Sequence, residues 1–322
     1  MTEAMNRALL IIALAIATGT AAQEPVDAAS RQWFTGSLYA VSPALSHAGA
    51  TAIEPYAIYS RNTGSFDADG VHHASSDGTD EAILLTVVKF GLTDRLTIAT
   101  TPAFSRSWNS GRESTDAGFG DLPIELEYRL QDGVVATGAP SVTASIGIRL
   151  PTGVHDHLRN PLNGRGSGAW SAKAGILAQS LFNTGDNHAM RVRLYGSVSI
   201  PVASVSVRDV SVYGTEDGFA GHVLPGASAE VGMSVGYALS QRWVLALDLL
   251  YDTAQGFALN GARADGIRLQ TRSPSSASFA IAPAVEYSWS ADAGIIAGVA
   301  FSAAGRNSAS FVAPQIAISL SF

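Results

Sequence analysis

The sequence predicts an all-β fold: a transmembrane antiparallel up-and-down β-barrel of twelve strands, with short periplasmic turns and long extracellular loops. Three observations support this prediction. Apolar and polar residues alternate with a period of two in twelve segments, short and long connections follow one another, and aromatic residues gather at the segment ends. The 322 residues are 47% hydrophobic and only 15% charged, against about 25% in an ordinary soluble domain. Cysteine is absent, so no disulfide can stabilise the chain.

The N-terminus has the features of a secretory signal. Arg7 precedes the apolar run 8–17, and small residues follow as far as Ala22, which predicts a signal peptide over residues 1–22, cleavage after Ala22 and export. Residues 23–50 show no clean alternation, and either a periplasmic segment or a plug inside the barrel would fit them. The barrel is therefore assigned to residues 51–322.

Each predicted strand has one apolar and one polar face. In GDLPIELEYRL (120–130) every second residue is apolar and the residues between are mostly charged, so the two faces of this strand meet different surroundings. A shift of register by one residue would turn all of its charges to the apolar side. The twelve segments are 53–61, 82–92, 95–105, 120–130, 140–150, 170–181, 188–201, 229–239, 243–251, 279–289, 295–301 and 312–322.

The connections between these segments also alternate. Tight turns are expected at 93–94, 131–133, 183–187, 240–241 and 291–292, and long polar loops at 62–80, 107–118, 152–168, 202–226 and 253–276. Only the last connection, 305–310, is short where a long one is due. Short turns at one end and long loops at the other are typical of outer-membrane barrels.

The apolar faces are predicted to meet outer-membrane lipid, because an arginine facing lipid at the bilayer midplane would cost roughly 2–4 kcal/mol. Aromatic residues then form a girdle at each interface. Beside the short turns these are Phe90, Tyr128, Tyr237, Trp243, Tyr287, Trp289 and Phe322; near the long loops they are Phe104, Trp170, Tyr251, Phe279 and Phe301.

The polar faces are predicted to line the interior and to neutralise one another across neighbouring strands. Their charged residues are Lys89, Asp121, Glu125, Glu127, Arg129, Arg149, Lys173, Arg191, Arg193, Glu230, Asp248 and Glu286. These pairs could simply fill the interior, or they could select solutes. Twelve strands lie between the eight that close on side chains and the sixteen that leave a wide channel, so the interior should be a narrow or plugged pore.

Three motifs, in this order, resemble those of the meta-pathway phenol degradation family of outer-membrane barrels. They are KFGLTDRLTI (89–98), GFGDLPIELEYRL (118–130) and IRLPTG (148–153) followed by GRGSGAW (164–170). The resemblance covers about residues 50–322 and implies a transporter or channel, in a family named for operons that handle aromatic compounds. Phe322, with the alternating apolar residues before it, similarly looks like the C-terminal signal read by the barrel assembly machinery.

Other functions find less support in the residues. The pairs His72-His73 and His155-x-His157 lie in long loops without a fixed third ligand, so they are interpreted as solvated and no metal or cofactor is expected. His188 lies at the short-turn end, where a surface-lipid hydrolase would not keep its base, so an enzyme is disfavoured. The net charge of −7 and the lack of a basic patch argue against nucleic acid. The expected function is a channel or transporter for small molecules, hydrophobic or aromatic ones among them; the alternatives are a non-conducting structural or adhesion barrel and, third, a hydrolase.

Overall fold

The computed structural model describes residues 29, 32–40, 42–185 and 188–322. The predicted signal peptide, residues 1–22, lies outside the described residues. Within the described part of the chain no helix is long and apolar enough to cross a membrane.

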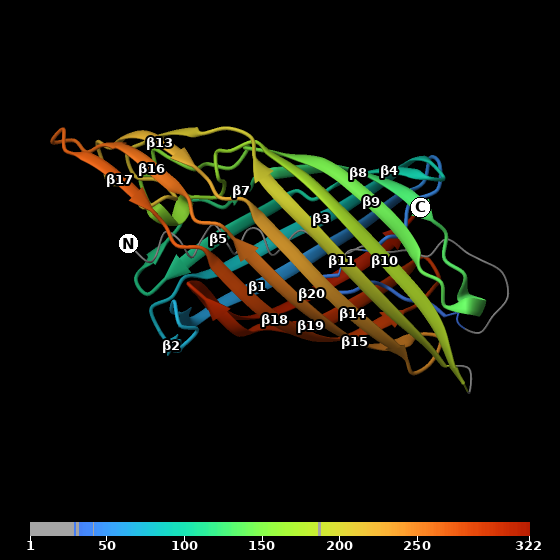
Figure 1. Cartoon of the computed structure of the whole chain (residues 1–322). Helices are drawn as coiled ribbons and strands as arrows, with labels where there is room; N and C mark the ends of the chain where they lie inside the picture. Colours follow the sequence, from blue (N-terminus) through green and yellow to red (C-terminus); the bar gives the residue numbers. More distant parts are fainter. Residues whose placement is uncertain (1–28, 30–31, 41, 186–187) are drawn as a thin grey trace.

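Twelve antiparallel strands close into a barrel, as predicted (Figure 1). Closure is complete because β1 pairs with both β3 and β20. The strands are β1 (Thr51–Phe66), β3 (Asp80–Thr93), β4 (Leu96–Thr100) continued by β5 (Ala103–Asn109), β8 (Leu122–Gln131), β9 (Ser141–Leu150), β10 (Ser171–Gly185), β11 (His188–Pro201), β14 (Ser228–Ala238), β15 (Trp243–Ala254), β18 (Ser276–Ser288), β19 (Ala293–Arg306) and β20 (Ser308–Ser321).

One barrel strand is interrupted between β4 and β5. Pairing of β4 with β8 stops at Thr100, opposite Ile124, and β5 then pairs with the short strand β7 (Gly118–Phe119). Pro102 and Pro123 lie at this break, and neither can donate a backbone hydrogen bond. The two prolines therefore account for the break in the ladder.

The outer wall is apolar along most of its length, as the alternation predicts. Many large hydrophobic side chains are exposed on it, including Ile146, Leu194 and Val231. Of the aromatic residues predicted beside the short turns, all are exposed except Tyr287, which is half-buried with its ring 4.7 Å from that of Trp243.

The long loops contain secondary structure that the sequence analysis did not predict. Small strands β2 (His72–Ala74) and β6 (Arg112–Glu113) extend the wall, and a separate four-stranded sheet, called the extension below, rises beyond the rim (Figure 1). The extension consists of β12 (Val205–Arg208), β13 (Ala220–Leu224), β16 (Ala258–Ala262) and β17 (Arg268–Arg272).

The extension follows the barrel below it strand by strand. Its order β12-β13-β16-β17 repeats the barrel order β11-β14-β15-β18, and each of its strands precedes or follows one of these barrel strands in the chain. Val207, Val223 and Leu259 are buried on its inner face, against Leu158 and Tyr213 of the surrounding loops. The extension is thus a small sheet with its own core, standing on one side of the barrel.

The connection between β8 and β9 is longer than the predicted turn at 131–133. It includes a 3₁₀ helix, η2 (Val135–Thr137), and Gly138 with φ 69°, a backbone region that favours glycine. The apolar residues around η2 do not alternate, so the pattern gave no sign of the extra turn.

Candidate functional site in the barrel interior

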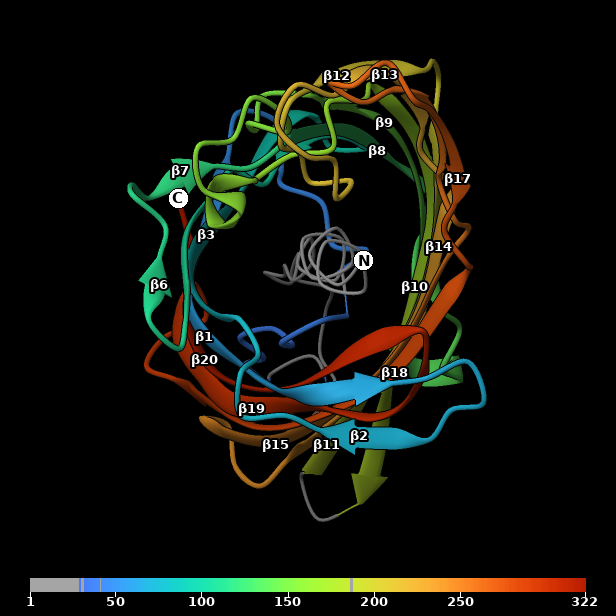
Figure 2. The same cartoon turned by 90° about the vertical axis from the view of Figure 1, so that its left-hand side faces the viewer.

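The polar faces of the strands enclose residues 32–40 and 42–46, called the inner segment below. It approaches the wall near the short turns at both of its ends: the Gln32 side chain donates to the carbonyls of Ser240 and Gln241, and Ser46 N donates to Thr97 Oγ1 at 3.2 Å. Between these ends, Tyr39 and Ala40 are buried among residues from several barrel strands. Figure 2 looks into the barrel and shows the blue trace of this part of the chain crossing the interior.

Basic side chains of the wall hold the carbonyl oxygens of the inner segment. Lys89 Nζ donates to the carbonyls of Ser42 and Ala44, each at 3.2 Å, and an Arg129 Nη donates to the carbonyl of Pro43 at 3.0 Å. A second group lies on β11. There Arg191 donates to the Gly36 carbonyl and Arg193 to the Ala40 carbonyl.

Carboxylates on the opposite side hold the backbone N–H groups. Thr35 N donates to Glu286 Oε2 at 2.8 Å, and Tyr39 N donates to Asp248 Oδ2 at 2.7 Å. Most polar contacts with the inner segment are therefore made to its backbone, and hydrogen bonds to charged groups are stronger than neutral ones.

Packing also depends on small residues in the wall. Leu38 of the inner segment lies against Gly298 of β19, where a Cβ would come to 2.7 Å from Leu38 Cδ1. The guanidinium of Arg191 lies 4.5 Å from the ring centroid of Phe34, an attractive cation–π contact. The inner segment thus fits this interior by shape as well as by hydrogen bonding.

Three buried or nearly buried ion pairs cross the interior. Arg191 pairs with Glu286 at 2.7 Å, with their side chains 1% and 0% exposed; Lys89 pairs with Glu127 at 2.6 Å, and Lys173 with Glu125 at 2.8 Å. The sequence analysis expected pairs between neighbouring strands. Each of these pairs instead skips at least one strand, because long side chains reach across the curved inner face of a barrel.

The charges are unevenly distributed around the interior. All predicted interior cations lie on β3, β8, β9, β10 and β11, whereas β14, β15 and β18 contribute only carboxylates there. Glu230 and Asp252 lie directly opposite each other in register, are buried, and form no ion pair within the described chain. The interior therefore has one side of mixed charge, which carries these cations together with Glu125 and Glu127, and one side that carries carboxylates alone, with the inner segment between them.

Two carboxylates of the inner face were missed by the sequence analysis. Glu54 and Asp252 are both buried there. Asp252 lies one residue beyond the predicted end of its strand. Glu54 lies on a strand whose inner face also carries Tyr56 and Ile58, so the polar alternation that would have revealed it is lost.

Asp121 lies at the long-loop end and binds a loop rather than a cation. Its carboxylate accepts hydrogen bonds from Gly153 N at 3.0 Å and from Ser167 N and Oγ, both at 2.8 Å. These bonds attach loop 152–168 to the barrel rim. Of the remaining predicted interior residues, Arg149 is half-buried on β9.

Loop 152–168 is anchored further by Arg165. Its buried guanidinium donates to the carbonyls of Ser105 and Leu162, and burial lowers its pKa, while the nearby Glu81 opposes this shift. In the GRGSG stretch (164–168) of this loop, a Cβ on Gly166 would lie 2.3 Å from Asp121 Oδ1. These glycines permit close packing, so loop 152–168 packs tightly against the barrel rim and covers part of the long-loop end.

The loop histidines have local partners. His73 Nε2 lies 2.8 Å from Asp67 Oδ2, and this hydrogen bond, with a backbone bond from Val71, lowers the pKa of Asp67. His157 Nδ1 lies 2.6 Å from Asp209 Oδ2. Among the described residues no group of three or more His, Cys, Asp or Glu is arranged to hold a metal ion. His188 stacks on Tyr237 with ring centroids 5.6 Å apart.

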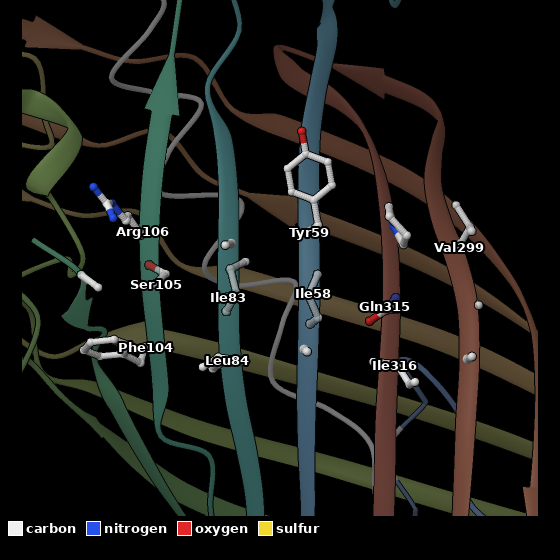
Figure 3. Close-up of a pocket in the computed structure, with 16 residues that line it drawn as sticks. Ile58, Tyr59, Ile83, Leu84, Phe104, Ser105, Arg106, Val299, Gln315 and Ile316 are labelled. Atoms are coloured by element: carbon white, nitrogen blue, oxygen red, sulfur yellow. The ribbon is translucent and has the colours of Figure 1, made fainter. Parts of the chain in front are cut away.

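A groove of about 810 Å³ lies across β5, β3, β1, β20 and β19 (Figure 3). Its floor includes the small residues Ala57, Ala82 and Ala297, and exposed Tyr59 and Leu84 flank them. These residues have the outward parity of their strands, so the groove belongs to the outer wall. Hydrogen-bond pairing of β1 with β3 and β20 continues behind it, so the groove is no passage to the interior.

No family model matches the chain, and no curated protein matches it. Among solved structures, the COG4313 outer membrane channel from Pseudomonas putida F1 is similar with a TM-score of 0.60 and 19% identity, over 85% of this chain and 96% of that one. The transport unit of the autotransporter AIDA-I from Escherichia coli gives 0.45 and 11%, over 85% and 90%. The Ralstonia pickettii toluene transporter TbuX gives 0.39 and 13%, over 95% and 96%. The first of these likenesses shows that the chain shares the β-barrel fold of that protein.

Proposed function

We propose that this protein is an outer-membrane channel for small molecules, closed in the described conformation by its inner segment. The observation that carries the proposal is the charged lining of the interior. Its cations and carboxylates bind the backbone of the inner segment, and that segment is not one of the barrel strands, so it could move out of the pore. A barrel built only for rigidity could fill the same space with side chains from its own strands.

The orientation follows from the loops. We place the short turns in the periplasm and the extension outside the cell, as in other outer-membrane barrels. The inner segment then occupies the periplasmic half of the pore as a plug. Exposed Phe322, beside the first strand, remains the proposed signal for the barrel assembly machinery.

The solute is proposed to be small and either hydrophobic or aromatic. This part rests on the sequence resemblance to the phenol degradation family, since the similar Pseudomonas putida protein is named only as an outer membrane channel, without a solute. Uptake of phenol, of a neutral sugar and of a dicarboxylate into proteoliposomes would test it. Faster entry of phenol than in protein-free vesicles, abolished by heat denaturation, is expected; equal rates for all three solutes would contradict this preference.

A non-conducting structural barrel is the second candidate, favoured by the same filled interior. The two candidates differ in whether the barrel contains an open path once the inner segment is removed. If removal of residues 32–46 produces a folded barrel without any conductance, the channel proposal fails and the structural one stands.

A further inference from the structure

The outer face of the extension carries three arginines that the rest of the protein leaves free. Arg208 on β12 and Arg268 and Arg272 on β17 are exposed, and none of them forms an ion pair within the described chain. By contrast, Arg263 in the turn at the tip pairs with Glu216 at 3.1 Å. Unpaired arginines on an ordered sheet are available to an external anion.

Strand register arranges these residues in rows. One row reads Arg208, Ala220, Ala262 and Arg268, the next Ser206, His222, Asn260 and Gln270, and the third Leu224, Ala258 and Arg272. No position in these rows is Asp or Glu. The extension's carboxylates Asp209, Glu216, Asp217 and Asp265 lie in the turns at its tip, beyond the first row.

This face points away from the barrel axis. Its opposite face is buried against loop 152–168, where His157 N donates to the carbonyl of Arg208 at 3.1 Å, and that loop is attached to the barrel rim through Asp121. Figure 2 shows β12, β13 and β17 along the rim, in line with the wall formed by β14 and β10. The outer face of the extension therefore continues the lipid-facing wall.

The height of the rows above the apolar wall fits a headgroup layer. Trp170, Tyr251 and Phe279 mark the upper edge of that wall, and Arg272 lies about seven residues beyond Phe279, or roughly 15–20 Å higher for a tilted strand. A phospholipid headgroup layer is only about 5–8 Å deep. A deeper layer of sugars and phosphates would reach the arginine rows.

We propose that the outer face of the extension binds a phosphorylated glycolipid of the outer leaflet, of the lipopolysaccharide type. Arginine binds phosphate through two parallel N–H groups, and the amides of Asn260 and Gln270 suit sugar hydroxyls between the arginines. The inference rests on the proposed outer-membrane placement, but it does not depend on whether the pore conducts.

Binding of the full chain in detergent to purified lipopolysaccharide, to phosphatidylglycerol vesicles and to inorganic phosphate tests the proposal. The variant R208Q/R268Q/R272Q is expected to lose at least about tenfold in lipopolysaccharide affinity. The control R95Q/R106Q/R112Q changes the net charge equally, on exposed arginines outside the extension, and should bind within about twofold of the parent.

The proposal is overturned if the triple variant keeps the affinity of the parent for lipopolysaccharide, or if the control loses as much affinity as the triple variant. It is also overturned if phosphatidylglycerol vesicles bind as tightly as lipopolysaccharide and the triple variant binds those vesicles no less tightly. Binding of inorganic phosphate alone would place the anion site without the glycolipid, and would also count against it. If the triple variant does not fold, Arg272→Gln and Arg272→Lys replace it. Both should weaken binding, the lysine variant less, because lysine keeps the charge but lacks the planar fork.

Discussion

The arginines inside the barrel and those on the extension have opposite surroundings. Arg191 and Arg193 are almost wholly buried, and their guanidinium groups bind carbonyls of the inner segment. Arg208 and Arg272 are exposed and have no ion-pair partner in the described chain. Inside the barrel the protein therefore supplies the ligands of its own cations, whereas on the extension the cations remain available to groups outside the protein.

The strongest way to break this contrast is to remove residues 32–46. The interior cations and carboxylates would then face water, as the extension arginines do, and the pore would lose its plug. We expect steady conductance of this variant in planar-bilayer recordings, and only rare openings of the full chain. Addition of the deleted peptide in trans should reduce the current, and failure to do so would mean that the strands rearranged.

The next largest effect is expected at the Lys89–Glu127 pair. Lys89→Met leaves Glu127 buried without its cation, which should lower the free energy of unfolding by about 3–5 kcal/mol. The double variant Lys89→Met/Glu127→Leu should regain most of this loss. The exposed pair Arg95–Asp132 serves as the control, because its removal should cost under about 1 kcal/mol. Urea unfolding in detergent measures all of these variants, and an equal loss at both pairs would contradict the burial argument.

A smaller, more selective effect is expected for Glu286→Gln. The variant weakens the hydrogen bond from Thr35 N and removes the ion pair with Arg191. The free energy with which the barrel binds the inner segment should therefore fall by about 1.5–3 kcal/mol. The open fraction in bilayer recordings should rise by about tenfold to a hundredfold. Glu113→Gln, which removes an exposed pair with Arg106, should leave gating unchanged.

The smallest effect sharpens the contrast at a loop. In the folded chain the pKa of Asp67 lies below its ordinary value of 3.8. The hydrogen bonds of the ionised carboxylate therefore stabilise the loop fully above pH 3.8, and this stabilisation is lost as the pH falls through the lowered pKa. The protection of residues 67–74 against hydrogen exchange, taken relative to the intrinsic exchange rate at each pH, should therefore fall below about pH 3.8. In Asp67→Asn the exchange should be faster at neutral pH and should lack this acid transition.

The twelve strands could be predicted from the sequence because each has one face toward apolar and one toward polar surroundings, and a period of two records that difference directly. The same alternation predicted that Leu194 and Val231 face outward. The extension could not be predicted in this way. Its strands are only four or five residues long, and β16, with the sequence ALNGA, shows no clear alternation.

The interior contacts were only partly predictable for a different reason. The charged residues could be identified, but the distance across a barrel depends on its closure, so the partner of Lys173 could not be chosen from the sequence. The inner segment is held mainly through its backbone, and backbone hydrogen bonding leaves no side-chain pattern to read. Nothing in the letters around Thr35 and Tyr39 indicates that their N–H groups bind Glu286 and Asp248.

Both ends of the inner segment lie at the same end of the barrel, since Gln32 and Ser46 each contact residues beside the short turns. A strand that crossed the pore from end to end would have to be threaded through it to open the path. A segment that turns back inside the barrel can instead be withdrawn from one side, without being threaded through the pore. Mechanical or binding work done in the periplasm would then suffice to unblock the pore.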